Sequence, residues 1–164
     1  MSQSEPEIRL TPRISIVKAT EQHIDDIAPR MREDDAREVW AMQYMTPSQA
    51  LARSLWLSDY TFAGLVDGRA EVMWGVGSLS PVFGVGMPWL LGTDAVIEHK
   101  RVFLRGSRQW IDIMLSRYEE LTNFVDDRNE VTKKWLQWLG FTLSEPTLMG
   151  YEQVPFRQFT LRRS

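Results

Sequence analysis

The sequence predicts one α/β (α+β) domain in which helices cover a central mixed sheet. Short alternating runs rich in β-branched residues are typical of strands, and they are interspersed with segments whose apolar residues recur at helical spacing. An Asp67-Gly68 pair between two strand-like runs indicates a tight hairpin. With 164 residues, of which 43% are hydrophobic, the chain is long enough for one well-buried core and short for two.

The first half of the chain predicts a strand followed by helices. Arg13–Ala19 alternates like a strand, and Thr20 then caps a helix that Pro29 should kink or end. After a second helix, the run Thr46–Gln49 combines a capping threonine, a proline at the first helical position and a glutamine three residues after the cap. This capping box predicts a third helix that ends near Ser58.

The second half predicts mainly strands, with helices between them. The expected strands are 60–66, 70–79, 89–92, 121–125, 141–143 and 156–162. Thr93 or Asp94 should cap a short helix, and a longer one is expected from about Arg105 to Tyr118. A last helix should begin at a capping box spanning Asp127 to Glu130, and Gly140 should end it. Its apolar stripe is expected to pack into the core and consists of Val131, Trp135, Trp138 and Leu139.

Charge and cysteine content exclude several classes of protein. The formal net charge is -3, and acidic and basic residues are mixed along most of the chain, which argues against a general nucleic-acid binder. Cysteine is absent, so the sequence offers no disulfide framework, no thiolate zinc site and no cysteine nucleophile. A reducing cytoplasm fits this composition, and we expect no metal cofactor.

The ends of the chain and its hydropathy predict a soluble, intracellular protein. No apolar run approaches the roughly 20 residues that cross a bilayer, so we expect no membrane segment. The N-terminus does not show the basic-then-apolar order of a signal peptide. Residues 1–12 are polar and contain two prolines, so we predict a flexible tail there and a single domain over residues 13–164.

The stretch NEVTKKWLQWLGF, residues 129–141, resembles the last helix of the Gcn5-related N-acetyltransferase (GNAT) superfamily, N-x-x-A-x-x-x-Y-x-x-x-G-F. Asn129, Gly140 and Phe141 match, whereas Thr132 stands in place of alanine and Leu136 in place of tyrosine. The order of elements is also similar from residue 13 onward. The resemblance implies a GNAT-like fold, with a mixed, mostly antiparallel, twisted sheet flanked by helices.

A narrower resemblance comes from three further segments. PWLLGT (Pro88–Thr93), RVFLRGSRQW (Arg101–Trp110) and NFVDDRN (Asn123–Asn129) are similar to phage-encoded GNAT-like proteins related to the small internal virion protein of short-tailed phages. In that group the fold does not guarantee enzymatic activity. The resemblance therefore implies either an enzyme or a phage structural protein.

The GNAT resemblance implies acetyl-CoA as a cofactor and a set of residues that bind it. Backbone groups of Leu90, Leu91 and Gly92 would contact pantetheine, and Asn129 corresponds to an asparagine that commonly contacts the cofactor. The glycine-rich phosphate turn is reduced to Gly106, because no second small residue follows in register. Ser107 and four nearby cations would then bind the phosphates in place of the missing turn: Lys100, Arg101, Arg105 and Arg108. The alternative is that these residues are ordinary solvent-exposed residues at the start of a helix.

The sequence also offers candidates for the proton transfers. The candidate bases are Glu71, Glu98 and His99, with Asp94 as a further acidic residue, and each has an ordinary reading as a surface group or helix cap. Leu136 cannot replace the tyrosine that protonates the departing thiolate, so Tyr118 or Tyr151 would have to act as the acid. A thiol of pKa near 8.5 also leaves tolerably without help.

Three functions follow from these observations. The first is an acetyl-CoA-dependent N-acetyltransferase acting on an unknown amine, with the acceptor site built by residues 32–58 and 80–88. The second is an inactive GNAT-fold phage protein that contacts other phage structural proteins during virion assembly, in the host cytoplasm or the virion. The third is a regulatory module that binds coenzyme A without turning it over.

Overall fold

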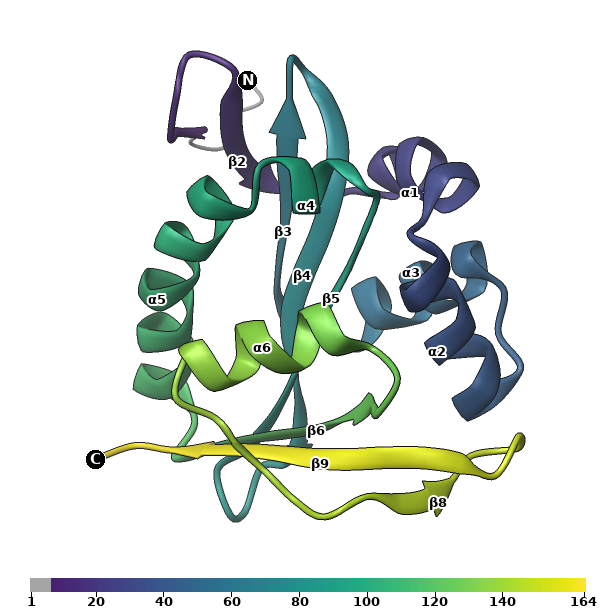
Figure 1. Ribbon diagram of the computed structural model, residues 1–164. Coiled ribbons are helices and arrows are strands. Elements are labelled where there is room, and N and C mark those ends of the chain that lie inside the picture. Colours follow the sequence, from purple (N-terminus) through teal and green to yellow (C-terminus); the bar gives the residue numbers. More distant parts are fainter. Residues whose placement is uncertain (1–6) are drawn as a thin grey trace.

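The computed structural model describes residues 7–164 and arranges them around one sheet (Figure 1). Within these residues the sheet has nine strands in the order β1-β2-β3-β4-β5-β6-β9-β7, and β8 pairs with β9. Neighbouring strands are antiparallel except β5 and β6, which are parallel. The predicted fold class, a mixed and mostly antiparallel sheet flanked by helices, is confirmed.

The strands are β1 (Ile8–Arg9), β2 (Ile14–Lys18), β3 (Ser58–Val66), β4 (Arg69–Ser80), β5 (Val85–Gly92), β6 (Glu120–Asp126), β7 (Thr142–Leu143), β8 (Thr147–Met149) and β9 (Val154–Arg162). The helices are α1 (Glu21–Ile27), a 3-10 turn η1 (Ala28–Arg30), α2 (Glu33–Gln43), α3 (Pro47–Leu57), α4 (Ala95–Glu98), α5 (Lys100–Arg117) and α6 (Glu130–Trp138).

Local sequence signals in the first half act as predicted. Pro29 lies in η1, which follows α1 directly, so the helix stops where proline removes a backbone donor. Thr46 caps α3: its hydroxyl accepts from the Gln49 N–H at 3.3 Å, and the Gln49 side chain accepts from the Thr46 N–H at 3.0 Å. Asp67 and Gly68 both have positive φ, as a two-residue hairpin turn requires.

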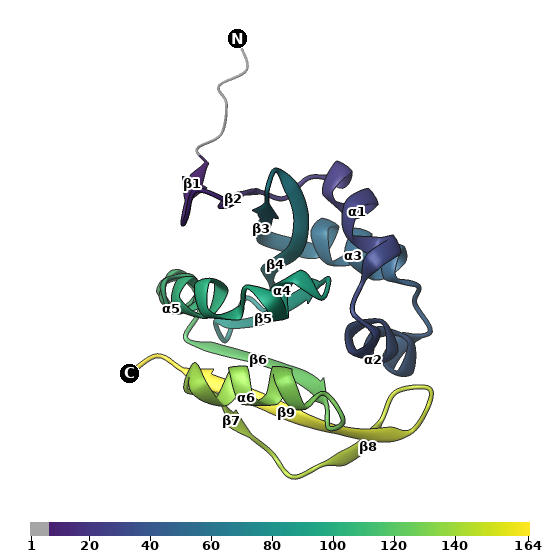
Figure 2. The same ribbon diagram turned by 45° about the horizontal axis from the view of Figure 1, so that its top comes forward.

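Two apolar clusters lie on opposite faces of the sheet. Alternation along β4 divides its side chains, so that Val72 and Trp74 join the cluster under α5 and α6, whereas Met73 joins the cluster under α1 and α3. Figure 2 shows α1, α2 and α3 grouped together, away from α5. No helix in residues 7–164 combines the length and apolar character needed to cross a bilayer.

Strands β5 and β6 start side by side and then separate. Their parallel pairing covers only Val85 with Glu120 and Gly86 with Leu121. Past these pairs, the Asn123 Nδ2 atom donates to the Pro88 carbonyl at 2.8 Å, and no further strand pairing joins the two strands. A gap therefore opens in the middle of the sheet, towards the carboxyl ends of β5 and β6.

The predicted flexible tail of residues 1–12 is wrong for its last part. Ile8 and Arg9 pair with Ile16 and Ser15 as strand β1, and Leu10 packs against the core. The sequence signal was weak because a two-residue strand shows no alternation and relies on its partner for hydrogen bonds. Residues 1–6 lie outside the part of the chain that the structure describes.

Candidate functional site

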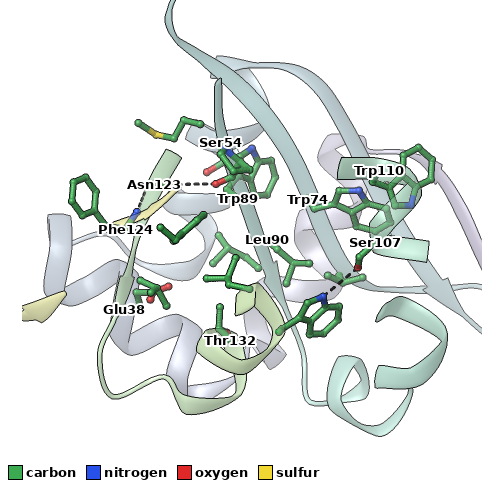
Figure 3. Close-up of a pocket in the computed structure, with 18 of the residues that line it drawn as sticks. Glu38, Ser54, Trp74, Trp89, Leu90, Ser107, Trp110, Asn123, Phe124 and Thr132 are labelled. Atoms are coloured by element: carbon green, nitrogen blue, oxygen red, sulfur yellow. Dashed lines mark hydrogen bonds between the residues drawn. The ribbon is translucent and has the colours of Figure 1, made fainter. Parts of the chain in front are cut away.

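A cavity of about 540 Å³ occupies the gap between β5 and β6 (Figure 3). This volume is within the range of about 300–1,000 Å³ typical of ligand pockets. The walls come from α2 and α3 on one side, from β5 and β6 in the middle, and from α5 and α6 on the other side. The predicted contribution of residues 32–58 and 80–88 to a binding site is consistent with this lining, which includes Val39, Met42, Ser54 and Met87.

The backbone of Leu90 faces this gap. Along an antiparallel strand, successive residues direct their backbone groups alternately towards the partner strand and away from it. The Pro88 carbonyl is bonded across the gap to Asn123, and both backbone groups of Gly92 bond to residues near the start of α2, so these residues point away from β4. Leu90 lies midway between them and has the same orientation. Its N–H and C=O therefore point into the gap, where no strand pairs with it.

The start of α2 closes the wide end of the gap with a buried ionic cluster. The Arg32 N–H donates to the Gly92 carbonyl at 2.8 Å, and the Asp35 Oδ2 atom accepts from the Gly92 N–H at 3.1 Å. Arg32 and Asp35 are 7% and 2% exposed and form an ion pair with 2.9 Å between Nη1 and Oδ1. Burial is the main cause that raises the pKa of Asp35 to about 6, against the opposing charge of Arg32.

Glu38, one helical turn after Asp35, lines the cavity. Its Oε1 atom accepts from the Asp126 N–H at 2.6 Å. Burial raises the pKa of Glu38 to about 8, and the negative charges of Asp35 and Asp126 raise it further against the Asp126 hydrogen bond and the charge of Arg32. No local sequence signal selects Glu38, because its hydrogen-bond partner lies 88 residues away.

Glu71, the first candidate base, is fully engaged elsewhere. It is 3% exposed and does not line the cavity. Its Oε2 atom accepts from Arg30 at 2.7 Å and from the Thr93 hydroxyl at 2.5 Å, and Oε1 accepts from Arg69 at 3.1 Å. Burial by itself would raise the pKa of Glu71, but the hydrogen bonds from Thr93 and Arg30 outweigh it and lower the pKa. Glu71 therefore holds β4 against η1 and the end of β5.

The other proton-transfer candidates also lie outside the cavity lining, and two of them, Asp94 and Tyr151, are exposed. Glu98 is exposed at the end of α4, and His99 is the half-buried residue that joins α4 to α5. Tyr118 is 5% exposed and donates a short hydrogen bond to Asp59. Burial and the adjacent Asp59 carboxylate raise the pKa of Tyr118 to about 12. A phenol held in this way stabilises the fold and does not face the gap.

The predicted phosphate cradle is not a helix start. Helix α5 begins at Lys100, not at Arg105, so Gly106 and Ser107 lie in its second turn and their N–H groups belong to the helix interior. Ser107 donates to the Phe103 carbonyl at 2.7 Å and accepts from the Trp135 indole at 3.3 Å. The predicted helix start near Arg105 is wrong, because Gly106 lies inside the helix and is not a turn residue.

Only two of the predicted cations lie in the first turn of α5. Lys100 and Arg101 are exposed there, three and four residues after the cavity-lining Ile97 of α4. Arg105 is exposed one turn further on. Arg108 lies over the Trp138 ring, with 4.3 Å from Cζ to the ring centroid, and donates to the Trp138 carbonyl at 3.2 Å. Arg108 therefore fastens α6 to α5.

Helix α6 corrects two further predictions. Asn129, not Asp127, is its N-cap: the Asn129 Oδ1 atom accepts from the Thr132 N–H at 3.3 Å. Asp127 instead pairs with Lys133 at 2.9 Å and with Arg157 at 2.5 Å. Asn129 is completely buried, and its Nδ2 atom makes no hydrogen bond of good geometry within residues 7–164, although the amide lies near enough to Asp35 to favour its charged form.

The apolar stripe of α6 is rotated from the predicted one. Trp135, Leu136 and Leu139 pack against the core cluster and line the cavity. Val131 and Trp138 are 39% and 45% exposed, so the prediction that they belong to the core is wrong. Gly140 ends the helix with a φ of +99°, as predicted.

Comparisons with solved structures reveal a common architecture at low sequence identity. Ribosomal-protein-S5-alanine acetyltransferase from Vibrio fischeri superposes with a TM-score of 0.67 and 14% identity, over 96% of this chain and 97% of that one. The RimL ribosomal L7/L12 α-N-protein acetyltransferase, solved in complex with coenzyme A, gives a TM-score of 0.67 and 6% identity, over 96% and 98%. A GNAT-family acetyltransferase from Bacillus anthracis gives 0.67 and 6%, over 96% and 98%.

This chain has the GNAT fold. The solved structures it resembles span nearly its whole length, so the shared architecture includes the sheet and the helices that flank it. No protein-family model matches the sequence, and no curated protein matches it. At identities of 6–14%, the likeness concerns the fold and leaves the chemistry to be argued from the residues themselves.

Proposed function

We propose that this protein is an acyl-CoA-dependent N-acyltransferase with acetyl-CoA as its donor. The observation that carries the proposal is the Leu90 backbone, whose N–H and C=O face an apolar cavity between two parted strands. A backbone N–H in such a cavity can stabilise the negative charge that develops on a carbonyl oxygen during acyl transfer. The donor, when bound, supplies the acyl thioester.

The residues around the gap fit part of the donor better than the rest. Leu90 offers an N–H and a C=O to an amide-bearing chain such as pantetheine, whereas the backbone groups of Gly92 are already bonded to Arg32 and Asp35. No glycine-rich cradle for phosphates exists in the described chain, so Lys100 and Arg101 in the first turn of α5 are the groups to neutralise them.

Calorimetric titration with acetyl-CoA tests this proposal. We expect binding to the unsubstituted protein, and we expect Lys100→Ala/Arg101→Ala to weaken it about tenfold because two phosphate-neutralising charges are lost. Arg117→Ala removes a cation from the last turn of the same helix and should leave the affinity unchanged. An absence of binding at millimolar acetyl-CoA contradicts both the enzyme and the coenzyme A-binding module.

A second candidate is a non-catalytic role in the assembly of a phage particle, through contacts with other phage structural proteins. It is favoured by Leu136, which packs in the core where the superfamily commonly has a proton-donating tyrosine. Large apolar side chains are also strongly exposed on α3 and at the β4–β5 turn, among them Trp56, Val82 and Phe83. Release of free thiol from acetyl-CoA in the presence of amines distinguishes the two candidates, since only the enzyme produces it.

A further inference from the structure

Glu38 occupies a place on the cavity wall that leaves one oxygen unused. Its Oε1 atom is fixed by the Asp126 N–H at 2.6 Å, which ties α2 to the end of β6. Within residues 7–164, no hydrogen bond to its Oε2 atom is found. Figure 3 shows the Glu38 carboxyl inside the pocket, on the side of Phe124 and Thr132. The carboxyl is thus oriented, while half of its hydrogen-bonding capacity remains for a ligand.

The aspartates near Glu38 have ion-pair partners, whereas Glu38 does not. The negative charges of Asp35, on its own helix, and of Asp126, on β6, act on Glu38, as does the positive charge of Arg32. Asp35 pairs with Arg32 at 2.9 Å, and Asp126 pairs with Arg128 at 2.6 Å. No ion pair to Glu38 exists in the described residues, so Glu38 is the carboxyl of this group that remains for a positive ligand in the cavity.

The fold does not need a carboxyl group at this position. The single hydrogen bond from the Asp126 N–H requires only an oxygen acceptor, which a glutamine amide provides equally well. Placing an ionisable group in a partly buried position without an ion-pair partner of its own costs stability. An ionisable group kept under these conditions on the wall of a ligand-sized cavity points to a role in chemistry.

We propose that Glu38 binds the ammonium group of the acceptor amine and takes up its proton. This inference rests on the proposed function, because it names the acceptor side of the same site. The amine must reach Leu90 across the cavity from α2, and Glu38 and Leu90 both line it. Glu38 therefore lies on a wall from which an amine can approach an acyl group held at the Leu90 backbone.

The proton transfers balance without a separate acid. Glu38 carboxylate takes one proton from the ammonium, which leaves a neutral amine with a free electron pair. The nitrogen forms a bond to the acyl carbon as the carbon–sulfur bond breaks, and the electron pair of that bond leaves with sulfur. A second proton on the attacking nitrogen passes to the sulfur and gives the free thiol. Glu38 then releases its proton to solvent. Tyr118 and the position of Leu136 have no part in this scheme.

The remaining acceptor wall defines the kind of amine. The residues that surround the approach from α2 and α3 are largely apolar: Val39, Met42, Met45, Leu57 and Phe124. Thioether side chains adapt to ligands of different shape. We therefore infer that the acceptor is a primary amine on an apolar alkyl or aryl group. A polyamine or a lysine-rich peptide fits less well, because this apolar wall offers no partner for additional positive charges.

The test compares Glu38→Gln with the unsubstituted protein in thiol release from acetyl-CoA. The amines are hexylamine, phenethylamine and spermidine, each assayed from pH 6 to pH 10, and acetyl-CoA affinity is measured separately by calorimetry. We expect Glu38→Gln to lower kcat/KM about 100-fold or more with unchanged donor affinity. The unsubstituted protein should show a rise in kcat/KM through about pH 8 that Glu38→Gln lacks. Spermidine should be the poorest of the three substrates.

Two further variants keep the result clear. Glu33→Gln, on the exposed first turn of the same helix, should behave like the unsubstituted protein. Glu38→Asp keeps a carboxyl and should retain part of the activity and the pH-dependent rise. Unchanged turnover in Glu38→Gln with normal donor binding overturns the role of Glu38 alone. Donor binding without thiol release from any of the amines overturns this inference and favours a protein that binds the donor without turning it over. Absence of donor binding in every protein overturns the proposed function and this inference with it.

Discussion

Glu71 on β4 and Glu38 on α2 are two carboxyls whose pKa values are shifted in opposite directions. Glu71 lies between two arginines and a threonine hydroxyl, and its pKa is lowered although burial opposes this. Glu38 has no ion-pair partner within residues 7–164, and burial, with the charges of Asp35 and Asp126, raises its pKa to about 8. Burial raises the pKa in both cases, but at Glu71 the hydrogen bonds outweigh it. Hydrogen-bond and ion-pair partners therefore decide whether a carboxyl stabilises the fold or remains available to a ligand.

Glu71→Ala should produce the largest loss of stability in this comparison. The substitution leaves the Arg30 guanidinium and the Thr93 hydroxyl without their common acceptor, so we expect the free energy of unfolding to fall by about 3 kcal/mol at pH 7. Urea denaturation measures this, with Glu98→Ala as the control, because Glu98 is exposed. A loss below about 1 kcal/mol would show that the Glu71 network is not what holds β4 to η1.

Glu38→Gln should remove a loss of stability that the unsubstituted protein shows as the pH rises. Between the ordinary pKa of 4.5 and the folded value of about 8, the folded protein keeps a proton that the unfolded chain has released. Stability through this group is therefore fully present below pH 4.5 and declines as the pH rises to about 8. We expect this decline to be about 2 kcal/mol between pH 6.5 and pH 9, and to be absent in Glu38→Gln.

The matched variant Glu71→Gln sharpens that result. Because the folded protein lowers the pKa of Glu71, its stabilisation is present above the ordinary pKa of 4.5 and is lost as the pH falls through the lower, folded value. In Glu71→Gln, the free energy of unfolding should therefore no longer contain the part that falls in acid, and its behaviour in base should be unchanged. Parallel pH curves for the two variants would remove the distinction between the two carboxyls.

Thr93→Val should have a smaller effect than Glu71→Ala. It keeps the shape of the side chain and removes one hydrogen bond to a buried carboxylate, which is worth about 1.5 kcal/mol. Thermal unfolding at pH 7 and at pH 4 measures the loss. Because Thr93 favours the charged form of Glu71, the destabilisation should be smaller at pH 4 than at pH 7.

Arg69→Ala should have the smallest effect. The Arg69 side chain is 61% exposed and the Arg30 side chain 33%, so solvent screens the Arg69 pair more strongly. We expect a loss below about 0.5 kcal/mol in urea denaturation. A loss equal to that of Arg30→Ala would mean that both arginines hold Glu71 equally, and that exposure does not rank them.

The parts of the fold that follow from neighbouring residues were predictable. Thr46 and Gln49 cap α3 through contacts three residues apart, and Gly140 ends α6 because its backbone adopts a positive φ. The order of strands and helices came from the change between two hydrophobic periods. Each of these signals is contained within one element or at its end.

The candidate site was less predictable, because it depends on contacts between distant elements. Glu38 and Asp126 meet only when α2 crosses the open end of the gap. Glu71 has no free oxygen because Arg30 and Thr93 converge on Oε2 and Arg69 donates to Oε1. Gly106 resembled a phosphate-binding turn, but the helix had already begun six residues earlier. Trp138 had the right spacing for the core, yet Arg108 covers it at the surface.

The parted strands also leave a seam in the backbone hydrogen bonding of the sheet. Strands β1 to β5 pair consecutively and form one antiparallel layer, whereas β6, β9, β7 and β8 form another. Within residues 7–164 the two layers share strand pairing only where Val85 and Gly86 meet Glu120 and Leu121. Few ladder hydrogen bonds would have to break for one layer to move relative to the other. Amide hydrogen exchange should therefore resolve two protection classes separated at this seam, and a ligand that spans it should slow exchange in both.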